Sequence, residues 1–211
     1  MSKQLPKHMQ RLYARLKTPA SIQTFLNTLP ANFESGGETY MSPLRTIREQ
    51  KAHCMEGALL AASILRYHGA KPLLMDLRVQ RPDQDHVVAL FQQGGYWGAI
   101  SKTNHAVLRY REPVYKTLRE LALSYFHEYF DNATGKKNLR EYSVPVHMGR
   151  FDHLEWETTE ADLWDIVEAV DNARHFPLLN KKQISNLRPA EQIEIAAGSI
   201  TEWNRSGKRN K

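Results

Sequence analysis

Residues 54–69 decide the fold, and they read Cys54-Met-Glu-Gly-Ala-Leu-Leu-Ala-Ala-Ser-Ile-Leu-Arg-Tyr-His-Gly69. The stretch is rich in good helix formers and carries no charge between Glu56 and Arg66. Gly69 suits the position just past a helix end. Because a helix with so little polarity is buried on most sides, the sequence predicts a central, buried helix that begins at Cys54.

Short strands are expected directly after this helix. Residues 86–91 are rich in β-formers, Gly94-Gly95 makes a tight turn, and residues 96–100 return, so 86–100 is predicted to be a hairpin. Further strands are predicted at residues 72–79 and 139–146, with Leu108 and Tyr110 extending the sheet.

Helices are expected on both sides of this strand region. They are predicted at residues 9–16, at 19–29 after the cap Thr18, in a turn at 43–49 after Ser42, at 117–130 behind a capping box, after a Thr158 or Thr159 cap, and at 189–203. Helices, then strands, then helices indicate an α+β protein with a small, mainly antiparallel sheet and a helix bearing Cys54 packed on it.

Composition bounds the class of protein. The chain has 211 residues, of which 41% are hydrophobic and 25% charged, so wholesale disorder, collagen and coiled coil are excluded. A single cysteine cannot form an internal disulfide. The sequence has no apolar run near the roughly 20 residues of a membrane span and no signal-peptide pattern, so we expect a cytoplasmic protein without membrane contact.

The net charge of +6 is concentrated at the ends of the chain. Residues 1–17 hold five basic and no acidic residues, and residues 201–211 hold four basic and one acidic residue, which leaves −2 for residues 18–200. Nucleic-acid binders usually carry their charge on a folded face interleaved with aromatic residues. The pattern therefore does not favour a nucleic-acid partner, and residues 205–211 are predicted to be a solvated basic tail.

Cys54 is the candidate nucleophile. A thiol at a helix N-terminus lies beside free backbone N–H groups and the positive end of the macrodipole, which favours the thiolate. His86 begins a predicted strand 32 residues later. If that strand packs on the first turn of the helix, the imidazole can act on the sulfur, as cysteine acyl transfer requires.

This order of elements resembles the core of the transglutaminase-like superfamily, a circularly rearranged relative of the papain fold. The matching stretches are Lys51-Ala-His-Cys54-Met-Glu-Gly-Ala-Leu-Leu, Asp85-His86-Val-Val-Ala-Leu-Phe and Gly95-Tyr-Trp97-Gly-Ala-Ile-Ser101, about a quarter of the chain. The length of the chain predicts one domain over 1–211. We expect a transglutaminase-like core at about 43–145, flanked by the predicted helical segments at 7–30 and 158–204 and followed by the basic tail.

The resemblance also leaves one role open. The family has an aspartate after the tryptophan where this chain has Ser101. Ser101 is the first candidate for a third member that orients His86, with Asn104 or Asp76 as alternatives. The backbone N–H of Cys54 would form part of an oxyanion hole, with Gln50 as a candidate second donor, and Trp97 is a candidate pocket wall.

A metal site is the competing interpretation of the polar residues. The candidates are His147, Asp152, His153, Glu155 and, further on, His175. The spacing of His147 and His153 fits no tight helical ligand pair, so no metal and no cofactor are expected.

Two functions from different classes are preferred to a third, nucleic-acid association through the basic termini. The first is a cysteine enzyme that cleaves or transfers an amide or peptide bond of a peptide, protein or other amide-containing substrate through a Cys54 thioester. The second is a catalytically decayed binding module that recognises a peptide or protein in the same cleft. The sequence leaves the substrate and the oligomeric state open.

Overall fold

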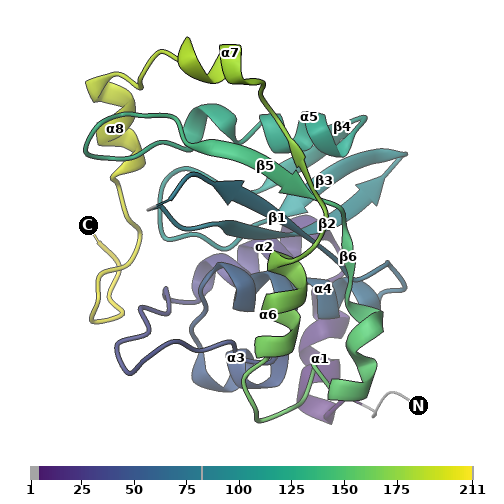
Figure 1. The fold of residues 1–211 in the computed structure, drawn as a ribbon. Coiled ribbons are helices and arrows are strands. Elements are labelled where there is room, and N and C mark those ends of the chain that lie inside the picture. Colours follow the sequence, from purple (N-terminus) through teal and green to yellow (C-terminus); the bar gives the residue numbers. More distant parts are fainter. Residues whose placement is uncertain (1–4, 82, 211) are drawn as a thin grey trace.

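A computed structural model describes residues 5–81 and 83–210 of the chain. The fold is mixed α/β and is built on an open antiparallel sheet with helices on both sides (Figure 1). Helices α1–α4 and α6 cover one face, and α5 covers the other. Within the described residues, no helix has the length and apolarity needed to cross a bilayer.

The sheet has seven strands. Its order is β4-β3-β2-β1-β5-β7, and β6 also pairs with β1; every pairing is antiparallel. The strands are β1 (Leu73–Val79), β2 (His86–Gln93), β3 (Tyr96–Ile100), β4 (Arg111–Tyr115), β5 (Leu139–Ser143), β6 (Val146–His147) and β7 (His175–Pro177). The predicted hairpin is confirmed, and Gly94 and Gly95 turn it with φ of 61° and 84°, a region that suits glycine.

Of the four helices before the sheet, α2, α3 and α4 begin at the predicted residues, whereas α1 begins two residues before the predicted position 9. They are α1 (Lys7–Arg15), α2 (Pro19–Thr28), α3 (Pro43–Glu49) and α4 (Cys54–Tyr67). Thr18 and Ser42 each accept a backbone N–H at the start of α2 and α3, and each is followed by proline. Helix α4 is buried along nearly its whole length, which confirms the prediction of a central helix.

Two apolar clusters fix the layers. Leu59 and Ile64 of α4 pack with Leu74, Val87 and Ala89 on one face of the sheet. The alternate strand residues, Met75, Leu77, Val88 and Leu90, pack with Leu121 and Tyr125 on the other face. This period-two alternation makes the sheet apolar on both faces, and each fully buried large side chain contributes about 1.5–3 kcal/mol.

Several elements differ from the sequence prediction. The helix expected at 117–130 is shorter: α5 (Leu118–Leu123) is followed by the 3₁₀ turn η1 (Phe126–Glu128). The sheet is extended by β4 from Arg111, not by Leu108 and Tyr110. The 3₁₀ segment η2 (Met148–Leu154) follows β6, and α6 (Trp164–Asp171) begins later than the predicted threonine caps.

The segment 158–204 is not wholly helical. It contains β7, which lies at the sheet edge against β5, as well as α6, α7 (Lys181–Ser185) and α8 (Gln192–Gly198). The short strand was missed because its sequence, His175-Phe-Pro177, has too few residues to show a periodicity.

The described part of the basic tail, residues 205–210, is exposed, as predicted, but it folds back on the protein. The guanidinium of Arg209 lies 4.9 Å from the centroid of the Trp203 ring and 3.2 Å from a Glu202 carboxylate oxygen, and it donates to the carbonyl of Asn27 at 3.2 Å. Residues Trp203 and Arg209 also form an antiparallel bridge. These contacts were not predicted, because they join α2 to a segment about 180 positions away.

Candidate active site

Cys54 is the first residue of α4 and lines a cleft of about 660 Å³. Its side chain is partly exposed and forms no disulfide. At the first helical position the backbone N–H has no partner within the helix, and the macrodipole adds positive potential. Both features favour negative charge on the sulfur and on an oxyanion beside it.

His86 comes to the same cleft from the first position of β2. Strand β2 pairs with β3, which ends at Ile100, so the next residue, Ser101, lies close to the start of β2. The His86 Nε2 atom is 2.7 Å from the Ser101 hydroxyl oxygen, and both side chains are buried. The structure therefore brings Cys54, His86 and Ser101 together, as the sequence predicts.

The direction of the His86–Ser101 hydrogen bond follows from the other contact of the hydroxyl. Ser101 Oγ lies 2.5 Å from the carbonyl oxygen of Leu108, and a carbonyl can only accept. The hydroxyl proton is therefore committed to Leu108, and Ser101 Oγ accepts from the N–H at His86 Nε2. A neutral His86 then has its lone pair at Nδ1, the nitrogen available to the Cys54 thiol.

Two imidazoles act on the thiol of Cys54. Burial raises the pKa of this thiol, but hydrogen bonds and positive charge from His53 and His86 more than offset burial and hold the pKa well below its usual range. The low pKa makes the thiolate available as a nucleophile near neutral pH.

His53 is a functional residue that sequence reasoning did not assign, although it directly precedes Cys54. Its Nε2 donates to the carbonyl of Thr39 at 2.7 Å and lies 3.4 Å from Oε1 of Glu56. Burial lowers the pKa of His53, whereas the bond to Cys54, the charges of Cys54 and Glu56 and the Thr39 carbonyl raise it to about 9. His53 is thus a fixed cation beside the sulfur.

Glu56 organises the start of α4 from inside the protein. Its fully buried carboxylate accepts from the Asn32 amide, the Thr39 hydroxyl and the backbone N–H groups of Met41 and His53. A buried carboxylate needs such partners to be tolerated. This carboxylate holds residues 39–41 against the helix, and those residues in turn place the carbonyl that orients His53.

Lys102 closes one wall of the cleft and is itself buried. Its Nζ donates to the carbonyl of Leu29 at 2.5 Å, and burial lowers its pKa to about 8. A Cβ added to Gly57 in the first turns of α4 would lie 2.3 Å from the Cβ of Lys102. Glycine at position 57 therefore allows the lysine chain to pass directly against the helix that bears Cys54.

The alternatives for the third member have other partners. Asn104 lines the cleft, but its side-chain amide pairs with the backbone N–H and C=O of Trp203. Asp76 stands opposite Val87 in the β1–β2 pair, and its carboxylate accepts from Nε2 of His175 at 2.9 Å. Neither side chain is bonded to His86.

The two residues predicted to bind or polarise substrate lie away from the cleft lining. Gln50 is the exposed last residue of the α3 region, and its amide donates to the carbonyl of Ile47. Trp97 lies on β3 opposite Gln92 and Tyr115 and packs on the cluster beneath α5. Both residues were predicted from their closeness in sequence to Cys54 and Ser101, and local chain direction carries them elsewhere.

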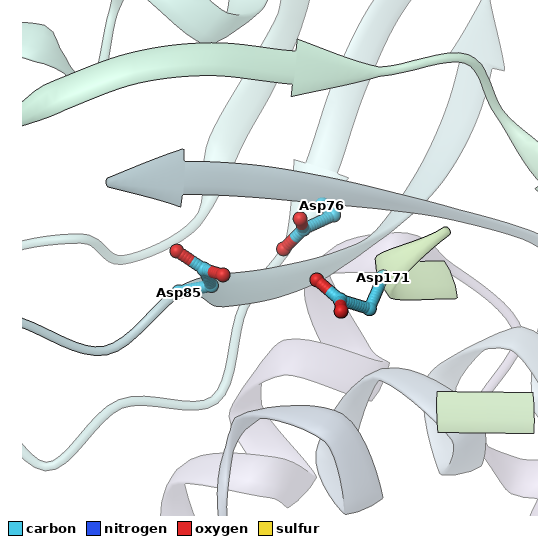
Figure 2. Close-up of side chains that lie close together, drawn as sticks. All are labelled: Asp76, Asp85 and Asp171. Carbon is cyan, nitrogen blue, oxygen red and sulfur yellow. The ribbon is translucent and has the colours of Figure 1, made fainter. Parts of the chain in front are cut away.

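The proposed ligands of the competing metal site do not gather. Asp152 forms an ion pair with Arg66, His147 accepts from Gly149, and His175 is paired with Asp76. One other carboxylate group, Asp76, Asp85 and Asp171, has oxygens within 4.8 Å of one another (Figure 2). Each of these three is already bonded, to His175, to the N–H of Val79 and to Arg78 respectively.

Comparison with known proteins adds no assignment. A scan against models of protein families gave no match, and a search of curated proteins found no similar sequence. The arrangement of Cys54, His53, His86 and Ser101 on a mixed α/β fold is therefore the basis for assigning a function.

Proposed function

We propose that this protein is a transglutaminase-like cysteine enzyme that acts on an amide or peptide bond through a thioester at Cys54. The observation that carries the proposal is a thiol at a helix N-terminus, held between two imidazoles, one of which is oriented by a buried acceptor. A purely structural cysteine would need neither the depressed pKa nor access to the cleft.

The first half of the reaction forms the thioester. The Cys54 thiolate attacks the carbonyl carbon, a C–S bond forms, and the oxyanion is expected to face the backbone N–H at the start of α4. The C–N bond breaks as the proton at Nδ1 of His86 passes to the leaving amine. During this step the N–H at Nε2 of His86 stays hydrogen-bonded to Ser101. Only Nδ1 of His86 therefore transfers a proton.

The second half releases the acyl group. Water or an amine attacks the thioester carbonyl while His86 Nδ1 accepts its proton, the C–S bond breaks, and the thiolate returns beside His53 and His86. Water gives hydrolysis, and an amine gives acyl transfer. His53 supports the thiolate in both resting and product states because it stays cationic up to about pH 9, which corresponds to its raised pKa.

The order of the elements supports membership of the transglutaminase-like class, as proposed from the sequence. A cysteine opens a buried helix, a histidine opens the second strand after that helix, and the third member follows the hairpin partner strand. The departure from the family lies at the third member, which is a hydroxyl in place of a carboxylate.

The hydroxyl at position 101 favours one second candidate, a decayed binding module that takes a peptide or protein in the cleft. A neutral acceptor stabilises an imidazolium less than a carboxylate does. In the serine-protease example, loss of the aspartate costs about 10⁴ in turnover.

The rate of Cys54 alkylation by iodoacetamide, followed by mass spectrometry across the pH range, separates the two functions. An ordinary thiol with a pKa near 8.5 loses about 300-fold in rate between its alkaline plateau and about pH 6. We expect the alkylation rate of Cys54 to fall by less than about tenfold over the same pH interval, and Cys54→Ala to abolish the label. The enzyme proposal would be overturned by an ordinary thiol profile, or by amide cleavage that survives in Cys54→Ala.

A further inference from the structure

Leu108 has an unusual backbone for its residue type. Its φ is +60°, the left-handed region that a bulky side chain adopts only when its surroundings impose it. Leu108 lies in the loop between β3 and β4 and lines the cleft. The contacts that impose this conformation lead from the candidate catalytic residues to a carboxylate on another element.

Both backbone polar groups of Leu108 are engaged, in different directions. Its carbonyl accepts the Ser101 hydroxyl at 2.5 Å, and its N–H donates to Oε2 of Glu128 at 2.7 Å. Leu108 is therefore a bridge between Glu128, at the end of η1, and Ser101, the acceptor for His86.

Glu128 is itself held in place. The same Oε2 accepts from Nη2 of Arg111 at 2.6 Å, and the Arg111 guanidinium lies 4.1 Å from the centroid of the Tyr125 ring. Arg111 also donates to the hydroxyl and carbonyl of Ser124 at 3.0 and 3.2 Å. Such a guanidinium has little freedom to turn, so the carboxylate it binds is a fixed point.

We propose that Glu128 is a positioning residue of the active site, acting through the strained backbone of Leu108 to keep the Ser101 hydroxyl an acceptor for His86. This inference rests on the proposed function and deepens it. In the transglutaminase-like family an aspartate orients the histidine. Here the Ser101 hydroxyl and the Leu108 backbone, held by the Glu128 carboxylate, would have that role.

The Ser101 hydroxyl needs a fixed partner because a hydroxyl can act as donor or as acceptor. A serine can donate or accept, whereas an ionised aspartate only accepts. If Leu108 relaxed to negative φ, its carbonyl would leave Ser101, and the hydroxyl proton would be free to turn toward His86 Nε2. The proton on neutral His86 would then lie at Nδ1, which could no longer accept the thiol proton of Cys54.

Other charged groups around Cys54 do not belong to the series of hydrogen bonds that joins Glu128, Leu108 and Ser101. His53 and Glu56 lie on its own helix segment, Glu34 lies beside His53, and Asp85, Lys102 and Tyr129 face the cleft. None of these is hydrogen-bonded to Glu128, Leu108 or Ser101. A change at Glu128 therefore reaches Cys54 mainly by way of Ser101 and His86.

The test compares Glu128→Ala, Glu128→Gln, Ser101→Ala and the Ser101→Ala/Glu128→Ala double variant. Glu112→Gln is the control, because it removes the negative charge of an exposed carboxylate next to Arg111. Two readouts serve: the rate of iodoacetamide labelling of Cys54 against pH, and the ¹⁵N chemical shifts of the His86 ring, which report which nitrogen carries the proton.

We expect Glu128→Ala to slow labelling at about pH 6 by about threefold to tenfold, a shift of half to one pH unit toward the ordinary thiol. The ring proton of neutral His86 should redistribute toward Nδ1. Glu128→Gln keeps an oxygen that can accept from Leu108 and should recover most of the rate, and Glu112→Gln should match the parent. In the Ser101→Ala background, Glu128→Ala should cause no further loss of labelling rate, because Glu128 acts on His86 through Ser101.

Two results would overturn the role of Glu128. One is that Glu128→Ala leaves both the labelling rate of Cys54 and the tautomer of His86 unchanged. The other is that Glu128→Ala lowers the labelling rate by the same factor in the Ser101→Ala background as in the parent. If Glu128→Ala does not fold, Glu128→Gln decides: a full tautomer change in this variant at unaltered stability would contradict action through the Leu108 hydrogen bond, because the glutamine can still accept from Leu108. An ordinary thiol profile in the parent protein is a different result, and it would overturn the proposed function itself.

Discussion

Gln23 of α2 holds both backbone polar groups of Ser101. The N–H of Ser101 donates to Gln23 Oε1 at 2.9 Å, and Gln23 Nε2 donates to the Ser101 carbonyl at 2.8 Å. A helix far upstream in the sequence thus supplies the missing hydrogen-bond partners of a residue just past the end of β3. This clamp fixes the backbone of Ser101, while Leu108 fixes its hydroxyl.

Replacement of Gln23 by alanine should destabilise the fold markedly. Two buried backbone groups would lose their partners, at a cost of about 1–3 kcal/mol each, and urea unfolding measures the loss. Thr24→Ala, which removes an exposed hydroxyl on the same helix, should change stability by less than about 0.5 kcal/mol. Equal stabilities of the two variants would show that the clamp contributes nothing.

The contribution of His53 to stability should depend on pH. Its folded-state pKa of about 9 lies above the ordinary histidine value of 6.5, so its stabilising effect is fully present below about pH 6.5 and is lost as pH rises through about 9. The free energy of unfolding of the parent minus that of His53→Asn should therefore shrink over this window. His8→Asn, at an exposed histidine of α1, is the control variant. A difference that is constant or grows with pH for His53 would contradict the cationic role.

Alanine at position 57 should destabilise the protein even though alanine favours helices over glycine. Alanine gains about 1 kcal/mol in helix propensity, but its Cβ would meet the Cβ of Lys102 at 2.3 Å. Overpacking of this kind costs about 1–3 kcal/mol. Gly36→Ala, where the added Cβ meets nothing within 4 Å, is the control for thermal unfolding. A Gly57→Ala protein more stable than the parent would show that Lys102 can move aside.

Removal of the Arg209 side chain should cost about 1 kcal/mol. Arg209 is about half exposed, and it combines a surface ion pair with Glu202 and a cation–π contact with Trp203, each worth at most about 1 kcal/mol. Arg205→Ala, an exposed neighbour, should leave the urea midpoint unchanged. The fold described for residues 205–210 would be contradicted by an Arg209→Ala protein as stable as Arg205→Ala.

Local signals made much of the fold predictable. Caps followed by proline marked α2 and α3, the apolar run marked α4, and Gly94-Gly95 marked the hairpin turn. The same local signals brought His86 and Ser101 together, because a hairpin fixes which residues are neighbours across two strands.

The supporting residues of the site could not be predicted in this way. Gln23 and Ser101 are 78 positions apart, and Glu128 reaches Leu108 across a loop and a helix. Neither pair leaves a periodicity or a motif in the sequence. The conformation of Leu108 is also opposed to its residue type, so propensity argues against the backbone that tertiary contacts impose.

The pairing of Asn104 with Trp203 has a consequence for the order in which the molecule is completed. The two residues are 99 positions apart, and Gly198, also on the cleft, comes just before Trp203. At a synthesis rate of about 5–20 residues per second, about 5–20 s pass between the two. During that interval the nascent chain carries Cys54, His86 and Ser101 but not the C-terminal wall of their cleft. The growing polypeptide on the ribosome therefore holds an unfinished site until residues 198–203 have been added.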